Sequence, residues 1–241
     1  MIYIIKNDLS SLFSAIFTYY VDKDLNVKVY TEYNQISYLE EIKYIENIQE
    51  GISRVERALR NILKGKFYDI KWVFKSGLED KNTIIFNYLC KVLDCKIDIS
   101  ENFNDPIVYR YNEIFEKVKK EVHHLKGFIR FSKTPEGIYY APFTPDNDVC
   151  DLIFPHFKNR FKSMPFILHD LRFDVIIAYN GKESKTIKQK IPPLTIKDEY
   201  NNLFKTYYNS VNIVERRNVK TMRNFLPKRY QTFMPEKNEL L

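Results

Sequence analysis

The spacing of apolar residues changes at Gly127, and this change constrains the possible folds of the 241-residue chain. Before Gly127, apolar residues recur at helical spacing, most clearly in a helix that Asp105 can cap, Pro106 begins and Gly127 ends. After Gly127, short runs rich in aromatic and β-branched residues are bounded by Pro or Gly, which is typical of strands. The sequence therefore predicts an α+β fold, with a mostly helical N-terminal part and an antiparallel sheet with flanking helices in the C-terminal part.

The expected elements follow from this periodicity. In the first part we expect a strand, a helix, a second strand and two further helices, at residues 2–5, 9–20, 28–31, 52–62 and from about 79. In the second part we expect strands at 128–131, 138–143, 166–169 and 175–179, and an edge strand at 184–191 after the Asn180-Gly181 turn. A helix between these strands is expected to start or kink at Pro155, and another amphipathic helix covers 203–214.

The two parts also differ in charge. Residues 1–104 hold 14 Lys or Arg against 15 Asp or Glu, a net of −1, while residues 105–241 hold 24 against 16, a net of +8. All ten prolines and all four histidines also lie in the second part. We therefore expect a mainly helical region with an N-terminal strand at 1–104 and a basic α+β region at 105–241, or one integrated domain. Clustered positive charge attracts polyanions such as DNA.

Composition excludes several classes of protein. The chain has no run of 18 apolar residues, and Asn7 and Asp8 come too early for a secretory signal, so we expect a cytoplasmic protein without a membrane partner. Three cysteines without a CxxC pair indicate reduced thiols rather than disulfides or a four-cysteine zinc site. The GxxxxGK[ST], GxGxxG, HExxH and GxSxG motifs are absent and the chain has six glycines, which disfavours nucleotide hydrolysis and dinucleotide chemistry. No cofactor is expected.

The segment RRNVKTMRNFLPKRYQTF, residues 216–233, is the strongest indication of a binding function. It interleaves Arg and Lys with Phe225, Tyr230 and Phe233, a combination suited to phosphate contacts and to stacking on exposed bases. Its basic residues are Arg216, Arg217, Lys220, Arg223, Lys228 and Arg229. A solvated helix end whose arginines pair with the acidic first region would give the same pattern.

Other polar groups have structural explanations of comparable or greater weight. His123 and His124 end a helix with their rings about 100° apart, so they do not chelate one metal together; we expect His123 to border the buried stripe and His124 to face outward. Asp146 and Asp148 suit capping and turn formation better than an acidic metal turn. The run from His169 to Arg172 places polar groups at a strand end, either as an active site or as a salt bridge, and Cys150 lacks a histidine close in sequence.

Several motifs together resemble one bacterial family. From Asp105-Pro106, the order and spacing of EVHHLKGFIRF, YYAPFTPDNDV, FPHFKNRF, ILHD, IVERRN and FLPKRY are similar to the DUF4130 family. The resemblance implies a protein of DNA metabolism or repair, encoded beside a radical-SAM protein, with a uracil-DNA-glycosylase-like domain fused to some members. It singles out Glu121, His123, Arg130, Asp146, Arg160, Asp170, Arg216 and Asn218. His124, Met222 and Gln231 depart from the family pattern, where Arg, Gln and Trp are expected.

Three functional hypotheses follow. The first is a DNA-associated accessory protein that acts with a radical-SAM partner; if it is catalytic, His123 acts as general acid or base oriented by Glu121 or Asp170, with Arg130 or Arg160 neutralising a phosphate. The second is a metal-dependent nuclease or base-processing enzyme that uses acidic residues and a histidine, namely Asp146, Asp148 and Asp170 with His123 or His169. The third is a protein adaptor whose basic C-terminal helix binds an acidic partner and not DNA.

Overall fold

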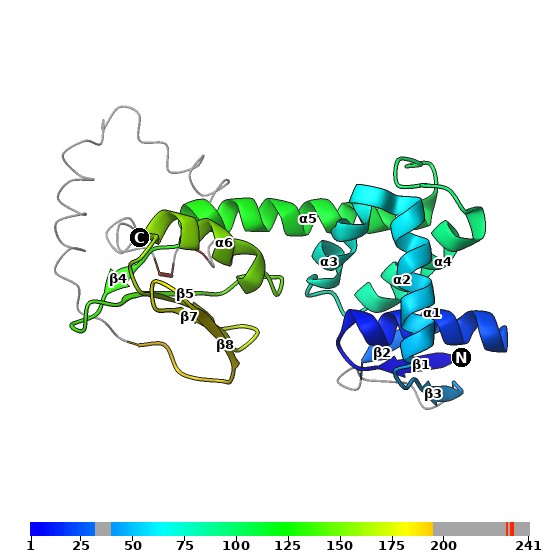
Figure 1. The fold of residues 1–241 in the computed structure, drawn as a ribbon, viewed down its shortest axis with the longest axis horizontal. Helices are drawn as coiled ribbons and strands as arrows, with labels where there is room; N and C mark the ends of the chain where they lie inside the picture. Colours follow the sequence, from blue (N-terminus) through cyan, green and yellow to red (C-terminus); the bar gives the residue numbers. More distant parts are fainter. Residues whose placement is uncertain (32–39, 195–229, 231, 234–241) are drawn as a thin grey trace. The chain divides into compact units, whose positions relative to one another are not determined.

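The computed structural model describes residues 1–31, 40–194, 230 and 232–233, and it confirms the α+β class (Figure 1). The chain divides into two compact units, unit 1 at Met1–Lys119 and unit 2 at Lys120–Leu241. The boundary falls inside helix α5 (Pro106–Phe128), so the backbone of one helix continues from the first unit into the second. Asp105 caps this helix, as expected, because its Oδ1 accepts hydrogen bonds from Ile107 N (2.9 Å) and Val108 N (3.3 Å).

Unit 1 contains a small parallel sheet. Its strands β1 (Ile2–Ile5), β2 (Lys28–Thr31) and β3 (Ile42–Tyr44) lie in the order β2-β1-β3. All four residues of the central strand are buried, which explains its continuous apolar run. Helix α1 (Leu9–Asp22) follows β1, and the Asp8 side chain caps it by accepting from Ser11 N at 2.7 Å. The expected strands and helix are confirmed here, whereas β3 was not predicted.

Helices complete unit 1. They are α2 (Gln49–Leu63), the 3-10 helix η1 (Lys64–Tyr68), α3 (Asp69–Phe74), α4 (Lys81–Cys95) and the first part of α5. The core of this unit includes fully buried aliphatic side chains from α1, α2 and α4, such as Leu12, Leu59 and Leu89. Helices α1 and α2 approach each other at Gly51, where a Cβ atom would lie 2.5 Å from the Phe17 ring.

Unit 2 contains a five-stranded sheet. The strands β4 (Ser132–Lys133), β5 (Tyr139–Phe143), β6 (Phe166–Asp170), β7 (Val175–Tyr179) and β8 (Ser184–Lys188) lie in that order. The prediction of an antiparallel sheet is wrong for one pair, because β5 and β6 are parallel. Helix α6 (Cys150–Phe161) connects them and returns the chain to the starting edge of the sheet, so β6 repeats the direction of β5. The other pairs are antiparallel.

Several boundaries in unit 2 differ from those expected. Residues 128–131 are the end of α5 and the residues after it, and the strand begins only at Ser132. Helix α6 starts at Cys150 rather than at Pro155, which lies exposed inside it; the proline forfeits only its own bond to the Asp151 carbonyl, while Ile153 and Phe157 remain buried. The turn at Asn180-Gly181 and the exposed edge strand β8 are confirmed. The helix expected at 203–214 lies outside the described residues.

Replacing Gly51 with alanine should destabilise the protein, because the new Cβ atom would overlap the Phe17 ring. We expect the free energy of unfolding to fall by about 1–3 kcal/mol in urea titrations of the full chain. Gly65→Ala is the matched control, since nothing lies within 4 Å of the Cβ position there. Equal stability of the two variants would contradict this account of the contact between α1 and α2.

Candidate functional site

A buried carboxylate organises one end of unit 2. The side chain of Glu121, on α5, is only 5% exposed. Its Oε1 accepts hydrogen bonds from Asp146 N at 2.7 Å and from the Tyr230 hydroxyl at 2.6 Å. Its Oε2 accepts from the backbone N and the side-chain Nδ2 of Asn147, at 2.9 and 2.6 Å. Hydrogen bonds of this kind compensate the burial of a charge, so Glu121 fastens both the loop at 144–149 and Tyr230 to α5.

A second buried carboxyl group, Asp170, has a different environment. It ends β6 and is fully buried. Its Oδ1 accepts from Arg172 N at 2.9 Å and from Phe173 N at 3.1 Å, whereas Oδ2 accepts no hydrogen bond from any described residue. Burial raises the pKa of Asp170 to about 7; the two backbone N–H groups oppose this effect, and the nearby charges of Asp148 and Glu121 add to it. Asp170 can therefore hold or release a proton near neutral pH.

The two carboxyl groups belong to one cluster with an ion pair at its surface. Arg172 Nη1 lies 2.9 Å from Asp146 Oδ1, and both side chains are about half exposed. The same guanidinium lies 3.4 Å from the Pro145 carbonyl oxygen. The pair thus joins the residues after β6 to the loop held by Glu121. Its exposure makes it a weak source of stability, so it mainly sets the position of the loop.

His169 does not join this cluster, because consecutive residues of a strand point to opposite faces of the sheet. It is buried, and its Nδ1 lies 2.7 Å from the Tyr140 hydroxyl. That hydroxyl accepts from Leu194 N at 3.2 Å, so its own proton is available for Nδ1. Burial lowers the pKa of His169, with a smaller opposing effect from Asp174. His169 is therefore a neutral side chain on the face away from Asp170.

His123 is also not part of the cluster that contains Glu121 and Asp170. It is exposed, and its ring centroid is 6.2 Å from that of His124, which is half-buried. The expectation that His123 borders the buried stripe is wrong, because its neighbours Glu121, Val122 and Leu125 occupy those positions on α5. Within the described residues, no hydrogen bond joins His123 to Glu121 or Asp170. The structure thus brings Glu121 and Asp170 into electrostatic contact without including His123.

The predicted basic residues are only partly described. Arg130 donates to the Gly127 carbonyl oxygen at 2.8 Å, and Arg160 is exposed on the last turn of α6. The remaining predicted residues, Arg216, Arg217, Asn218, Arg223, Lys228 and Arg229, lie outside the described part of the chain.

His156, which the sequence did not single out, lies in the positive electrostatic potential of nearby cations. Burial lowers the pKa of His156, and the positive charges of Lys126 and Arg160 lower it further. Lys126 is on α5 and Arg160 is on α6, so these two helices both bring positive charge to this part of unit 2.

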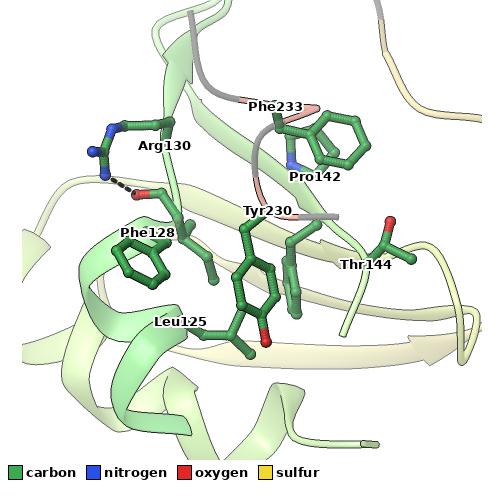
Figure 2. Close-up of a pocket in the computed structure, with 9 residues that line it drawn as sticks. Leu125, Phe128, Arg130, Pro142, Thr144, Tyr230 and Phe233 are labelled. Carbon is green, nitrogen blue, oxygen red and sulfur yellow. Dashed lines mark hydrogen bonds between the residues drawn. The ribbon is translucent and has the colours of Figure 1, made fainter. Parts of the chain in front are cut away.

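Tyr230 lines a narrow apolar pocket between α5 and β5 (Figure 2). Its ring centroid is 5.9 Å from that of Phe128, and the side chain is only 5% exposed. The pocket is lined by Leu125, Phe128, Ile129, Arg130, Pro142, Phe143, Thr144, Tyr230 and Phe233. The expectation that Tyr230 stacks on an exposed base is therefore wrong, because its ring is buried and its hydroxyl binds Glu121. Tyr230 is instead held against α5 by its hydrogen bond to Glu121.

The residues that the structure covers lack two features, a metal-binding cluster and a membrane-spanning helix. Among them, no group of three or more His, Cys, Asp or Glu side chains is placed to hold a metal ion. No helix in the same residues is both long and apolar enough to cross a membrane. No disulfide joins Cys90, Cys95 and Cys150, all of which the structure describes; Cys90 and Cys150 are buried and Cys95 is exposed.

The replacement Asp170→Asn should change how stability depends on pH. The folded-state pKa of Asp170, about 7, lies above the unfolded value of about 4, so the wild-type protein loses stability as the pH rises between them. We expect the free energy of unfolding of the variant, relative to that of wild type, to increase by up to about 1.4 kcal/mol for each pH unit in this window. Urea unfolding from pH 4 to 8 measures this difference. The exposed control Glu183→Gln should follow wild type. A constant difference between Asp170→Asn and wild type would refute the assignment.

The replacement Tyr230→Phe should weaken unit 2, because it removes a hydrogen bond to a buried charge but keeps the ring. We expect the free energy of unfolding to fall by about 1.5–3 kcal/mol. Tyr44→Phe, at a side chain that is largely exposed, is the control and should have no measurable effect. An unchanged unfolding midpoint for Tyr230→Phe would show that the hydrogen bond to Glu121 contributes little.

Comparison with known proteins identifies a family. A solved structure described as the DHH domain of a member of a ribosomal protein family shares 13% identity over 67% of this chain, with a TM-score of 0.21. This chain spans about half of that structure's length, 52%. No curated protein matches the chain. The model of DUF4130, a domain of unknown function, matches residues 79–236. The chain therefore belongs to the DUF4130 family.

Proposed function

We propose that the chain is a cytoplasmic accessory protein of DNA metabolism or repair that binds DNA through unit 2. The net charge of +8 on residues 105–241 supports the proposal, because phosphate contacts supply most of the affinity for nucleic acid. The first part of the chain has a net charge of −1 and adds no comparable attraction. Six of the basic side chains lie within residues 216–229.

The anchoring of Tyr230 is the observation that carries the proposal. Tyr230 follows Arg229 directly in the chain, and its hydroxyl binds Glu121 across 109 residues of sequence. The basic segment at 216–229 therefore ends at a point fixed to α5. The segment is thus attached to the same unit as Lys126, Arg130 and Arg160.

The potential of unit 2 favours an anionic partner as well. Burial lowers the pKa of His156, and the positive charges of Lys126 and Arg160 lower it further, so both cations act on its ring. A phosphate placed between such cations would relieve their mutual repulsion. Arg130, whose guanidinium is held by the Gly127 carbonyl, borders the pocket that contains Tyr230. Arg130 and Arg160 would therefore contact the DNA backbone, and the basic segment would extend this contact.

The family resemblance adds a radical-SAM protein as the partner of the proposed complex. A pull-down with the neighbouring radical-SAM protein, before and after nuclease treatment, separates two forms of the proposal. A complex that dissociates after treatment is bridged by DNA. A complex that survives, together with an absence of DNA binding by the purified chain, would instead favour a protein adaptor whose basic segment contacts its partner.

The double replacement Arg216→Gln and Arg217→Gln should weaken DNA binding and flatten its salt dependence. We expect the slope of log K against log[salt] to decrease in magnitude by about 1 for each phosphate that the protein no longer neutralises. Fluorescence anisotropy with labelled DNA across a salt series measures this slope. The matched control, Arg54→Gln with Arg57→Gln, removes the same charge from exposed positions of unit 1. Equal affinities for the two double variants would exclude the basic segment as the DNA-binding surface.

A further inference from the structure

Strand β8 is one of the two edge strands of the sheet in unit 2 (Figure 1), and lysine is frequent in its sequence and beside it. Within residues 182–190 there are four lysines against a single acidic residue, Glu183. All four are exposed: Lys182, Lys185, Lys188 and Lys190. The sequence predicts only a weakly hydrophobic edge strand here. The segment lies outside the basic segment at 216–233 and contains no aromatic residue, so its lysines do not match the pattern that indicated nucleic-acid binding there.

These four lysines have no ion-pair partner within the described residues. Lysines on α5 show the contrast, because Lys117 lies 2.7 Å from Glu113 and Lys119 lies 3.1 Å from Glu116. The intrahelical pairs neutralise much of the charge of their lysines, whereas the charge along β8 faces solvent. Positive charges that lie close together without negative partners repel one another. A bound polyanion would reduce this electrostatic repulsion.

The pairing of β8 with β7 fixes how the lysines are presented. Lys185 pairs with Ala178 and Lys188 pairs with Val175, three residues apart along β8. Because strand residues alternate, these two lysines lie on opposite faces of the sheet, and positive charge projects from both faces of the same edge. From Lys185 to Lys188 the strand extends about 10 Å at about 3.3 Å per residue.

An open groove lies beside Lys185. It is lined by Ile138, Pro165, Ile167, Ala178, Tyr179, Asn180, Glu183, Ser184 and Lys185, so the groove carries apolar and aromatic side chains, one lysine and one carboxylate. Such a groove can receive the sugar or base of a nucleotide whose phosphate contacts the lysine. The groove therefore places an aromatic side chain, Tyr179, near the lysine, and the combination of aromatic rings with positive charge is typical of surfaces that bind single-stranded nucleic acid.

We propose that the edge strand β8 is a second nucleic-acid contact, at which Lys182, Lys185, Lys188 and Lys190 bind the phosphate backbone. This contact rests on the proposed DNA binding by unit 2 and extends it to a surface outside the basic segment at 216–229. The lysines bind phosphate as point charges, so the contact tolerates any base sequence. The groove beside Lys185 directs the contact toward strands with unstacked bases.

The test replaces all four lysines with glutamine in the full-length protein. Anisotropy with labelled single-stranded DNA should show an affinity at least about tenfold lower at low salt, and a slope smaller in magnitude by about 0.7 for each phosphate that the variant no longer neutralises. The control variant, Lys6→Gln, Lys23→Gln, Lys64→Gln and Lys96→Gln, removes the same charge from exposed positions spread over unit 1. It should retain most of the affinity. Replacing the four β8 lysines with arginine should preserve binding, because charge is kept.

The outcomes separate this inference from the proposed function. If the wild-type protein binds DNA and the glutamine variant of β8 binds as well as the control, the β8 contact is overturned while DNA binding stands. If the wild-type protein does not bind DNA, the proposed function fails and the β8 contact fails with it. Edge lysines also prevent strands from pairing between molecules, so sedimentation must show that the glutamine variant stays in the wild-type assembly state. A fall in affinity for the arginine variant would count against binding through charge.

Discussion

The buried carboxylate of Glu121 is the constraint on which unit 2 depends. A charge removed from water must be matched by hydrogen bonds, and here the donors come from the loop at 144–149 and from Tyr230. These partners are distant in sequence, so the hydrogen bonds of one side chain join α5, the loop after β5 and Tyr230. Glu121, which was expected to orient a catalytic His123, and Tyr230, which was expected to stack on a base, are in the structure the two partners of this connection.

Asp170 shows how a nearby carboxyl group acquires a different property. Glu121 receives hydrogen bonds on both oxygens, whereas Asp170 receives two on Oδ1 and none on Oδ2 from any described residue. Burial therefore favours the protonated form of Asp170, and the charge of Glu121 strengthens this preference. Of the residues expected to be catalytic, Asp170 has the environment of an acid–base group, while Glu121 has that of a structural anchor.

Much of this fold could be predicted where one periodicity covers a long segment. The stripe of α5, the buried run of β1 and the Asn180-Gly181 turn are local features of this kind. The parallel pairing of β5 with β6 could not be predicted, because it depends on where α6 returns the chain. The exposure of His123 and the burial of Glu121 could not be predicted, because the buried face of α5 includes the carboxylate of Glu121. The hydrogen-bond donors that allow this burial lie far from Glu121 in the sequence. The lysines of β8 are visible in the sequence, but only the structure shows that no described carboxylate pairs with them.

The measurement that tests the central claim most directly is the affinity of the purified full-length protein for single-stranded, double-stranded and uracil-containing DNA across a salt series. It should be made with and without Mg²⁺ or Mn²⁺ while the DNA is monitored for cleavage. DNA binding through unit 2 predicts a linear fall of log K with log[salt], with intact DNA in every condition. An affinity that does not depend on salt, or the absence of binding at physiological salt, would contradict it, and metal-dependent cleavage would replace the accessory role with that of a nuclease.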